Sequence, residues 1–291
     1  MDCEKKKMRI LRVFPKKTSY TPIDPLAYYP NGMEQSPMWG LFPGFHEIHI
    51  SCAFTWNKKY CEDLAYQFRS TQDKPVLLGG PAFGSEVSNF VQGLYLKPNI
   101  IFTSRGCNNN CPWCIVPKIE GKLKELPICQ GNLIQDNNFL QTSRHHKDQV
   151  FEMLKTQKRI QFKGGLEADL IDDHFVENVR RLSIDELWLA CDTDGSLKNL
   201  EKAAHKLTKA GFTREHIKCY ALIGDDIDKN EERLQKIWHA GAMPFAQLYR
   251  DFGDKKTEYS KEWNAFSRSW QRPAAINSHM KKGTDFRNFG T

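Results

Sequence analysis

The feature that most restricts the fold is a regular alternation of strand-like and helix-like segments between residues 99 and 270. Apolar runs predict six strands, over residues 99–103, 132–136, 159–165, 186–191, 217–224 and 244–249. Amphipathic segments predict helices over residues 143–157, 172–181, 197–211, 228–240 and 261–270. Successive β-α steps require parallel pairing through right-handed crossovers, so we expect an α/β fold, either a doubly wound sheet or an incomplete barrel.

The region before residue 98 carries a shorter version of the same rhythm. Strands are predicted over residues 9–14, 47–54 and 75–84, with a helix over 58–70 and a long loop over 18–44. We therefore expect a small N-terminal region over 1–97 and a larger domain over 98–272. Residues 273–291 are predicted to form a polar and loose C-terminal tail.

The composition is that of a globular protein, with 40% hydrophobic and 26% charged residues. The sequence contains no apolar run of the length that spans a membrane, and its first residues lack the apolar core of a signal peptide. We therefore expect a cytoplasmic protein without a membrane partner, in a compartment that keeps thiols reduced. The formal net charge of +7 is compatible with an anionic partner such as a nucleic acid.

Three of the nine cysteines lie together in the stretch CNNNCPWC, at Cys107, Cys111 and Cys114. The stretch follows the first strand of the larger domain, and parallel sheets bind ligands at the carboxyl ends of their strands. In a reducing compartment, clustered cysteines indicate a metal or redox site more often than a disulfide. A [4Fe-4S] cluster held by only three thiolates leaves one iron with an open coordination position. An open position lets a substrate or cofactor bind the metal directly, as in catalytic zinc sites.

Zinc is the alternative metal for these cysteines. A structural zinc site requires four ligands, so the triplet would need one more from elsewhere in the chain. The candidates for this fourth ligand are Cys129, His145 and His146. The spacing also differs from the four-cysteine run of bacterial ferredoxins.

The triplet, with Trp113 directly before its last cysteine, resembles the C-x3-C-x-φ-C signature of the radical S-adenosylmethionine (SAM) superfamily. The resemblance covers about residues 98–270 and implies a partial (β/α)6 barrel of TIM type. It implies that the three cysteines bind a [4Fe-4S] cluster and that SAM chelates the fourth iron. An external electron donor of flavodoxin or ferredoxin type would drive cleavage of SAM to methionine and a 5′-deoxyadenosyl radical. This radical abstracts a hydrogen atom from the substrate, while the protein holds the reactants and excludes water.

The resemblance also suggests roles for residues at the other strand ends. Where the family commonly has Gly-Gly-Glu after the second strand, this chain has Asp136, Asn137 and Asn138. The predicted SAM-binding residues are Arg105, Asn138, Glu167, Asp192, Ile223 and Gly224, with Asp169 and Thr193 as weaker candidates. Tyr249 and Arg250 follow the sixth strand and are predicted to face the substrate. Each position also has a structural interpretation, because aspartates cap helices and glycines form turns.

The N-terminal region resembles part of the Rossmann-like module that precedes the barrel in cobalamin-type radical SAM proteins. The resemblance is partial, since about three strands are predicted where the full module has five. We favour a degenerate module that shapes the active site over one that binds cobalamin. A cobalamin-dependent radical SAM methylase is the first alternative function.

The substrate itself is unknown from the sequence. The basic charge balance makes a nucleotide or a nucleic acid base our first expectation for it. A further alternative is a non-catalytic, zinc-stabilised protein that binds nucleic acid.

Overall fold

The computed structural model describes residues 9–30, 42, 44–84, 94–253 and 255–282. The chain forms two compact units. Unit 1 contains Met1–Pro98 together with the short segments Lys118–Glu120 and Phe252–Lys256, and unit 2 contains the remainder. The main division after Pro98 lies one residue from the boundary expected from the sequence, which did not predict the two short segments of unit 1.

Unit 1 is built on a four-stranded parallel sheet with the strand order β2-β1-β3-β4. Its strands are β1 (Ile10–Val13), β2 (Ala27–Tyr28), β3 (Glu47–Ser51) and β4 (Val76–Gly79). Strand β2 lies inside the segment that the sequence analysis assigned to a long loop. Its two residues pair with β1 but carry no alternating apolar pattern, so periodicity gave no signal for it.

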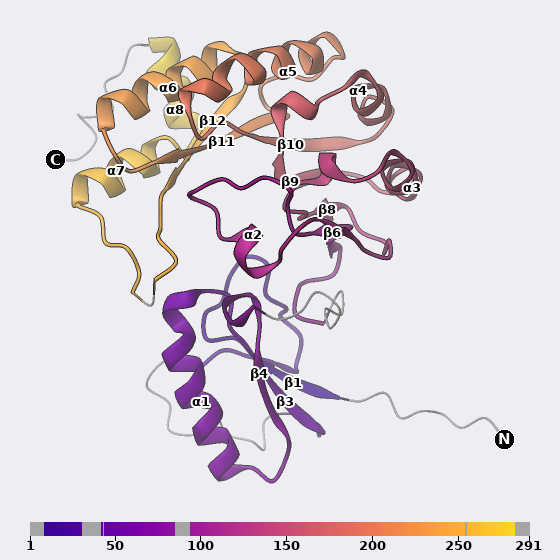
Figure 1. Ribbon diagram of the computed structural model, residues 1–291, viewed down its shortest axis with the longest axis vertical. Helices are drawn as coiled ribbons and strands as arrows, with labels where there is room; N and C mark the ends of the chain where they lie inside the picture. The colour runs from indigo at the N-terminus through magenta and orange to yellow at the C-terminus, as the bar shows by residue number, and fades with distance from the viewer. Residues whose placement is uncertain (1–8, 31–41, 43, 85–93, 254, 283–291) are drawn as a thin grey trace. The chain divides into compact units, whose positions relative to one another are not determined.

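One helix, α1 (Lys58–Thr71), packs on one face of this sheet (Figure 1). Alternate residues of β1 and β3 point into a core that the apolar side of α1 completes. The fully buried members include Leu11, Val13, Ile48 and Cys61. The intervening residues of β3 are all polar, whereas those of β1 are Ile10 and Arg12, so the opposite face of the sheet is mostly polar.

Unit 2 contains a six-stranded sheet with the order β12-β11-β10-β9-β8-β5, and every neighbouring pair is parallel. Its strands are β5 (Ile100–Ile101), β8 (Leu133–Ile134), β9 (Ile160–Leu166), β10 (Ile184–Ala190), β11 (Ile217–Ile223) and β12 (Met243–Leu248). The expected α/β fold with parallel sheets is confirmed. The strands follow one another in chain order without the reversal that defines a doubly wound sheet. The strand pairs described do not join β12 to β5, so this pairing does not close the sheet into a barrel.

Helices follow the strands of unit 2 and cover one face of the sheet (Figure 1). They are α3 (Arg144–Leu154), α4 (Asp173–Val179), α5 (Leu197–Lys209) and α6 (Ile227–His239). Side-chain caps define where three of them begin: Ser143, Asp172 and Asp226 each accept a hydrogen bond from the backbone N–H three residues later. Right-handed crossovers between neighbouring strands place all these helices on the same side.

The segment after Arg272 differs from its prediction as a loose tail. Helix α7 (Lys261–Ser269) is followed by α8 (Pro273–Lys282), in which Ile276 is fully buried. Proline at the first helical position favours this start, because its φ angle is already helical. The polar composition concealed Ile276, which packs into the unit 2 core, and the partly buried Ala275 and Met280, which pack against it. Residues 283–291 lie outside the described residues.

Among the described residues, no helix combines the length and the apolar character needed to cross a membrane. Two smaller elements complete the fold near the cysteines, namely the two-stranded sheet of β6 (Ser104–Arg105) and β7 (Lys124–Glu125) and the short helix α2 (Val116–Ile119).

Gly164 allows the backbone of β9 to approach the segment that follows β8. The pairing of β9 with β10 is interrupted by a register shift between Phe162 and Leu166. Gly164 lies in this bulge, and a Cβ atom there would be 1.6 Å from the backbone oxygen of Asp136. The close approach is therefore available only to glycine.

We expect Gly164→Ala to lower the free energy of unfolding of unit 2 by about 3 kcal/mol, because the backbone at Gln135 and Asp136, directly after β8, must move to relieve the overlap. Urea titration followed by tryptophan fluorescence measures the change. Gly195→Ala is the matched control, since its nearest atom would be the Thr193 hydroxyl oxygen at 3.8 Å. Equal stability of the two variants would contradict this explanation of the bulge.

Candidate functional site

The cysteine loop leaves the carboxyl end of β5, and the β6–β7 hairpin holds its two ends together. Antiparallel pairing joins Ser104 to Glu125 and Arg105 to Lys124. Inside the hairpin, the Cys107 N–H donates to the Gly121 oxygen at 3.1 Å.

The turn before the first cysteine requires glycine. Gly106 adopts a φ of +80°, and a Cβ atom there would lie 2.4 Å from the Lys122 oxygen. The loop therefore begins in a tight turn that a larger residue would disrupt.

A buried carboxylate anchors the start of this loop to β8. Asp136 lies two residues after the end of β8 and is 1% exposed. Its carboxylate accepts hydrogen bonds from the Thr103 N–H at 2.6 Å, the Thr103 hydroxyl at 2.5 Å and the Ser104 hydroxyl at 2.8 Å. Burial still raises the pKa of Asp136 above its ordinary value, because the lost hydration outweighs these hydrogen bonds.

The two asparagines after Asp136 extend the same connection. Asn137 Oδ1 accepts from the Gly106 N–H at 3.2 Å, and Asn138 Nδ2 donates to Glu167 Oε2 at 2.6 Å. The Oδ1 atom of Asn138 is buried and has no hydrogen-bond partner among the residues that the structure describes. Asn138 Oδ1 is therefore available to accept a hydrogen bond from a ligand, close to the Glu167 carboxylate.

Glu167 follows the last residue of β9 and lies close to the cysteine loop. Gln141 Nε2 donates to Glu167 Oε2 at 2.9 Å and to Asn109 Oδ1 at 3.0 Å. Gln141 Oε1 accepts from the Asn108 N–H at 2.8 Å. One glutamine side chain thus connects the end of β9 to the segment between the first two cysteines.

Asp192 connects the end of β10 to the same loop. The carboxylate accepts from the Leu222 N–H at 3.1 Å and from the side chain of Trp113. Burial raises the pKa of Asp192, and these two hydrogen bonds oppose the shift.

The second cysteine of the triplet lies among these negatively charged groups. Burial raises the pKa of Cys111, and the charges of Cys114, Cys107, Asp192 and Glu167 raise it further, in that order. The strand-end carboxylates therefore lie near enough to influence the thiol. Deprotonating all three cysteines would concentrate negative charge here, and a bound cation would stabilise that state.

The ends of β11 and β12 are joined by a tyrosine. Gly224 has a φ of +147°, and a Cβ atom there would lie 2.6 Å from the Tyr259 hydroxyl. This hydroxyl donates to the Tyr249 oxygen at 2.6 Å, while Arg250 Nη1 donates to the Thr257 oxygen at 3.2 Å. Tyr259 therefore contacts the strand ends that carry the SAM-binding residue Gly224 and the substrate-facing residue Tyr249 predicted from the sequence.

Other predicted residues have surroundings of a different kind. The Arg105 guanidinium lies over the Phe102 ring, 4.4 Å from its centroid. Ile223 is 2% exposed and belongs to the core between sheet and helices. Asp169 is exposed. The Thr193 hydroxyl shares a hydrogen bond of 2.9 Å with the Ser196 hydroxyl before α5.

Three contributors were missed by the sequence analysis, namely Gln141, Tyr259 and the hydrogen bond from Trp113. Gln141 closes the short 3-10 turn η5 (Phe139–Gln141), whose first two residues are buried. The available signal was a run of polar residues, 135–138, directly after a buried strand. Tyr259 had no signal of this kind, since it lies in an irregular segment before α7.

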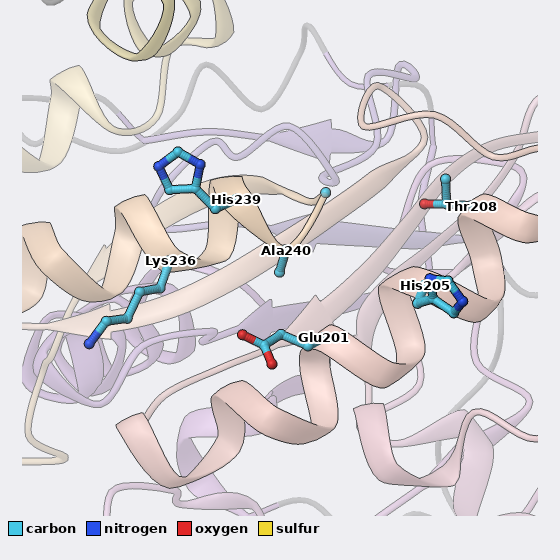
Figure 2. Close-up of a pocket in the computed structure, with 7 residues that line it drawn as sticks. Glu201, His205, Thr208, Lys236, His239 and Ala240 are labelled. Carbon is cyan, nitrogen blue, oxygen red and sulfur yellow. The ribbon is translucent and has the colours of Figure 1, made fainter.

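A separate hollow of about 440 Å³ lies between α5 and α6 (Figure 2). Its lining residues are Glu201, His205, Thr208, Lys236, His239, Ala240 and Gly241. These residues are concentrated toward the carboxyl ends of the two helices, which lead into the amino ends of β11 and β12. The hollow therefore lies toward the other end of these strands from the cysteine loop and contains none of the predicted site residues.

Comparison of the chain with protein-family models finds no match, and comparison with curated proteins finds none either. Within the described part of the chain, no group of three or more His, Cys, Asp and Glu residues is arranged to hold a single metal ion. The chemistry of the site is therefore inferred from its cysteine thiols and strand-end carboxylates.

We expect Asp136→Asn to remove a pH-dependent cost to stability. Because folding raises the pKa of Asp136, its contribution to the free energy of unfolding falls as pH increases from the ordinary carboxyl value of 3.8 through the folded value. Asparagine keeps an acceptor for the Thr103 N–H and does not ionise. The variant should therefore gain stability relative to wild type as pH increases.

Urea titrations at several pH values between about 4 and 7 measure this difference, a range that begins at the ordinary carboxyl pKa. Glu177→Gln on α4 removes an exposed carboxylate and serves as the control. Parallel stability curves for wild type and Asp136→Asn would show that the buried carboxyl is not the cause.

Proposed function

We propose that the chain is a radical SAM enzyme whose single [4Fe-4S] cluster is bound by Cys107, Cys111 and Cys114. The observation that carries the proposal is the hydrogen bonding between the cysteine loop and two strand-end carboxylates. Gln141 joins Asn108 to Glu167, and the Trp113 side chain donates to Asp192. Three thiolates suit soft metals and iron-sulfur clusters. The two carboxylates lie at the ends of neighbouring strands, where a cationic cosubstrate would be favoured.

The strand order of unit 2 supports a partial (β/α)6 barrel. Six parallel strands in chain order, with helices on one face, are the arrangement of an incomplete barrel. In such a barrel the carboxyl ends of the strands surround the active site. The cysteine loop, Glu167, Asp192 and Gly224 all lie at this end.

The bound cofactors would supply reductive cleavage of the SAM carbon–sulfur bond, with one electron from an external flavodoxin- or ferredoxin-type donor. The products would be methionine and a 5′-deoxyadenosyl radical, which would abstract a hydrogen atom from the substrate. The protein's own residues would bind and orient. Glu167 and the unpartnered Asn138 Oδ1 are acceptors for the SAM ammonium group. Asp192 is an acceptor for a ribose hydroxyl, and Gly224 would border the adenine ring at the end of β11.

Tyr249 and Arg250 follow β12 at the same end of the sheet and would face the substrate. A cationic side chain suits an anionic substrate, and the net charge of +7 points the same way. We therefore propose nucleotide or nucleic acid modification as the reaction class. Arg105 would contribute a cation beside the first cysteine.

A cobalamin-dependent radical SAM methylase is the second candidate because of unit 1. Its strand order β2-β1-β3-β4 contains the reversal at which doubly wound sheets bind ligands. Corrin absorbance in protein produced with added cobalamin would favour this candidate.

The decisive test is anaerobic reconstitution with iron and sulfide, followed by dithionite, SAM and mass detection of 5′-deoxyadenosine. We expect wild type to bind four irons and produce deoxyadenosine. Cys111→Ala should produce none above the protein-free background, because one thiolate ligand is missing.

Cys129→Ala is the matched control, since this exposed cysteine lies outside the triplet and should be dispensable. A wild-type chain that retains no iron would refute the cluster, and about one zinc per chain would favour a zinc-stabilised nucleic-acid-binding protein instead.

A further inference from the structure

We propose that Gln141 is a positioning residue that couples the cysteine loop to the carboxylate of Glu167. This inference rests on the proposed function and assigns a role to a residue outside the set predicted from the sequence. It concerns how the cluster-binding loop and the SAM-binding carboxylate are kept in a common geometry.

The backbone that carries Gln141 is firmly held. Phe139 and Leu140, which precede it in η5, are 1% and 3% exposed. Thr142, which follows it, is also buried, and its hydroxyl donates to the Phe139 oxygen at 2.8 Å. The Gln141 side chain therefore starts from a fixed point in the core of unit 2 and extends toward the site.

The orientation of the Gln141 amide is determined by its partners. The Asn108 N–H can only donate, so the atom 2.8 Å away must be the amide oxygen. The Glu167 carboxylate can only accept when ionised, so the atom 2.9 Å away must be the amide nitrogen. The second hydrogen of this nitrogen reaches Asn109 Oδ1 at 3.0 Å. Both requirements agree, which leaves one arrangement for the side chain.

This arrangement has one consequence for each partner. Glu167 Oε2 receives hydrogen bonds from Gln141 and Asn138, which leaves Oε1 to accept from a ligand. Asn108 and Asn109, which lie between Cys107 and Cys111, are held by the amide of Gln141. A change in the position of Glu167 therefore alters the position of the Asn108–Asn109 segment, and the reverse also holds.

The Cys107 side chain is a further partner of Gln141. Its sulfur lies 3.6 Å from Gln141 Oε1. The hydrogen bonds that join Gln141 to Asn108, Asn109 and Glu167 do not involve this sulfur.

The residue makes these contacts without contributing much apolar packing. Its neighbours Phe139 and Leu140 belong to the buried core, whereas Gln141 itself is half-buried and absent from that core. Removing its amide should therefore weaken the site more than the fold. That difference separates a positioning role from a structural one.

The test measures SAM binding and iron content, neither of which requires turnover. We expect reconstituted Gln141→Leu to keep its thermal midpoint within a few degrees of wild type, since one half-buried residue changes. Its dissociation constant for SAM, measured by anaerobic equilibrium dialysis, should increase about tenfold, because Glu167 loses a charge-assisted hydrogen bond. Gln130→Leu is the matched control, an exposed glutamine whose side-chain oxygen accepts a hydrogen bond from Gln157.

A charge-swap pair makes the test independent of the leucine variant. Gln141→Glu places a second carboxylate against Glu167 and should weaken SAM binding and iron retention. Gln141→Glu/Glu167→Gln restores one carboxylate and one amide with the hydrogen bond reversed. We expect the double variant to recover the iron content that Gln141→Glu loses.

The outcomes separate the two proposals. Unchanged SAM affinity in Gln141→Leu, or iron content in the double variant no better than in Gln141→Glu, would overturn the role of Gln141 while leaving the radical SAM assignment intact. Wild type that binds neither iron nor SAM would overturn the proposed function, and the coupling role with it.

Discussion

Parallel pairing in chain order is the constraint on which the candidate site depends. Each crossover in unit 2 returns the chain in the same direction beside the strand that it has just left, so every carboxyl end lies at one edge of the sheet. Glu167, Asp192 and Gly224 are separated by 25 and 32 residues in the chain but follow three neighbouring strands. The cysteine loop follows the first strand of the same sheet. No local interaction could assemble these groups.

Three carboxylates lie at the candidate site, and each accepts hydrogen bonds from neighbouring donors of the protein. Asp136 is satisfied by Thr103 and Ser104, Glu167 by Asn138 and Gln141, and Asp192 by the Leu222 N–H and Trp113. These donors are neutral, so they orient the carboxylates without cancelling their charge. The raised pKa of Asp136 and Asp192 shows that hydration is only partly replaced. A cationic ligand would stabilise the ionised carboxylates in place of the lost hydration.

The sequence predicted more of the scaffold than of the site. All six strands of unit 2 and the helices α3 to α7 lie where the apolar periodicity of the sequence indicated, because an element that buries one face repeats its apolar residues at a fixed spacing. Strand β2 and helix α8 escaped prediction, since one is only two residues long and the other buries a single Ile276 in a polar segment. In the site, Glu167 and Asp192 were recognised by their position after a strand. Gln141 was not, because its partners lie 26 to 34 residues away in the chain.

By itself, the sequence determined the order of the main strands and helices of unit 2 and the spacing of Cys107, Cys111 and Cys114, because both depend on residues that are close together in the chain. It left open whether the parallel sheet reverses its strand order. It could not assign roles to Asn137 or Gln141. Tertiary structure decided these points, since strand neighbours and side-chain hydrogen bonds are set by packing between segments far apart in the chain. The hydrogen-bond partner of a polar side chain is a property of the assembled sheet edge, where burial makes each unpaired group costly and so selects one arrangement.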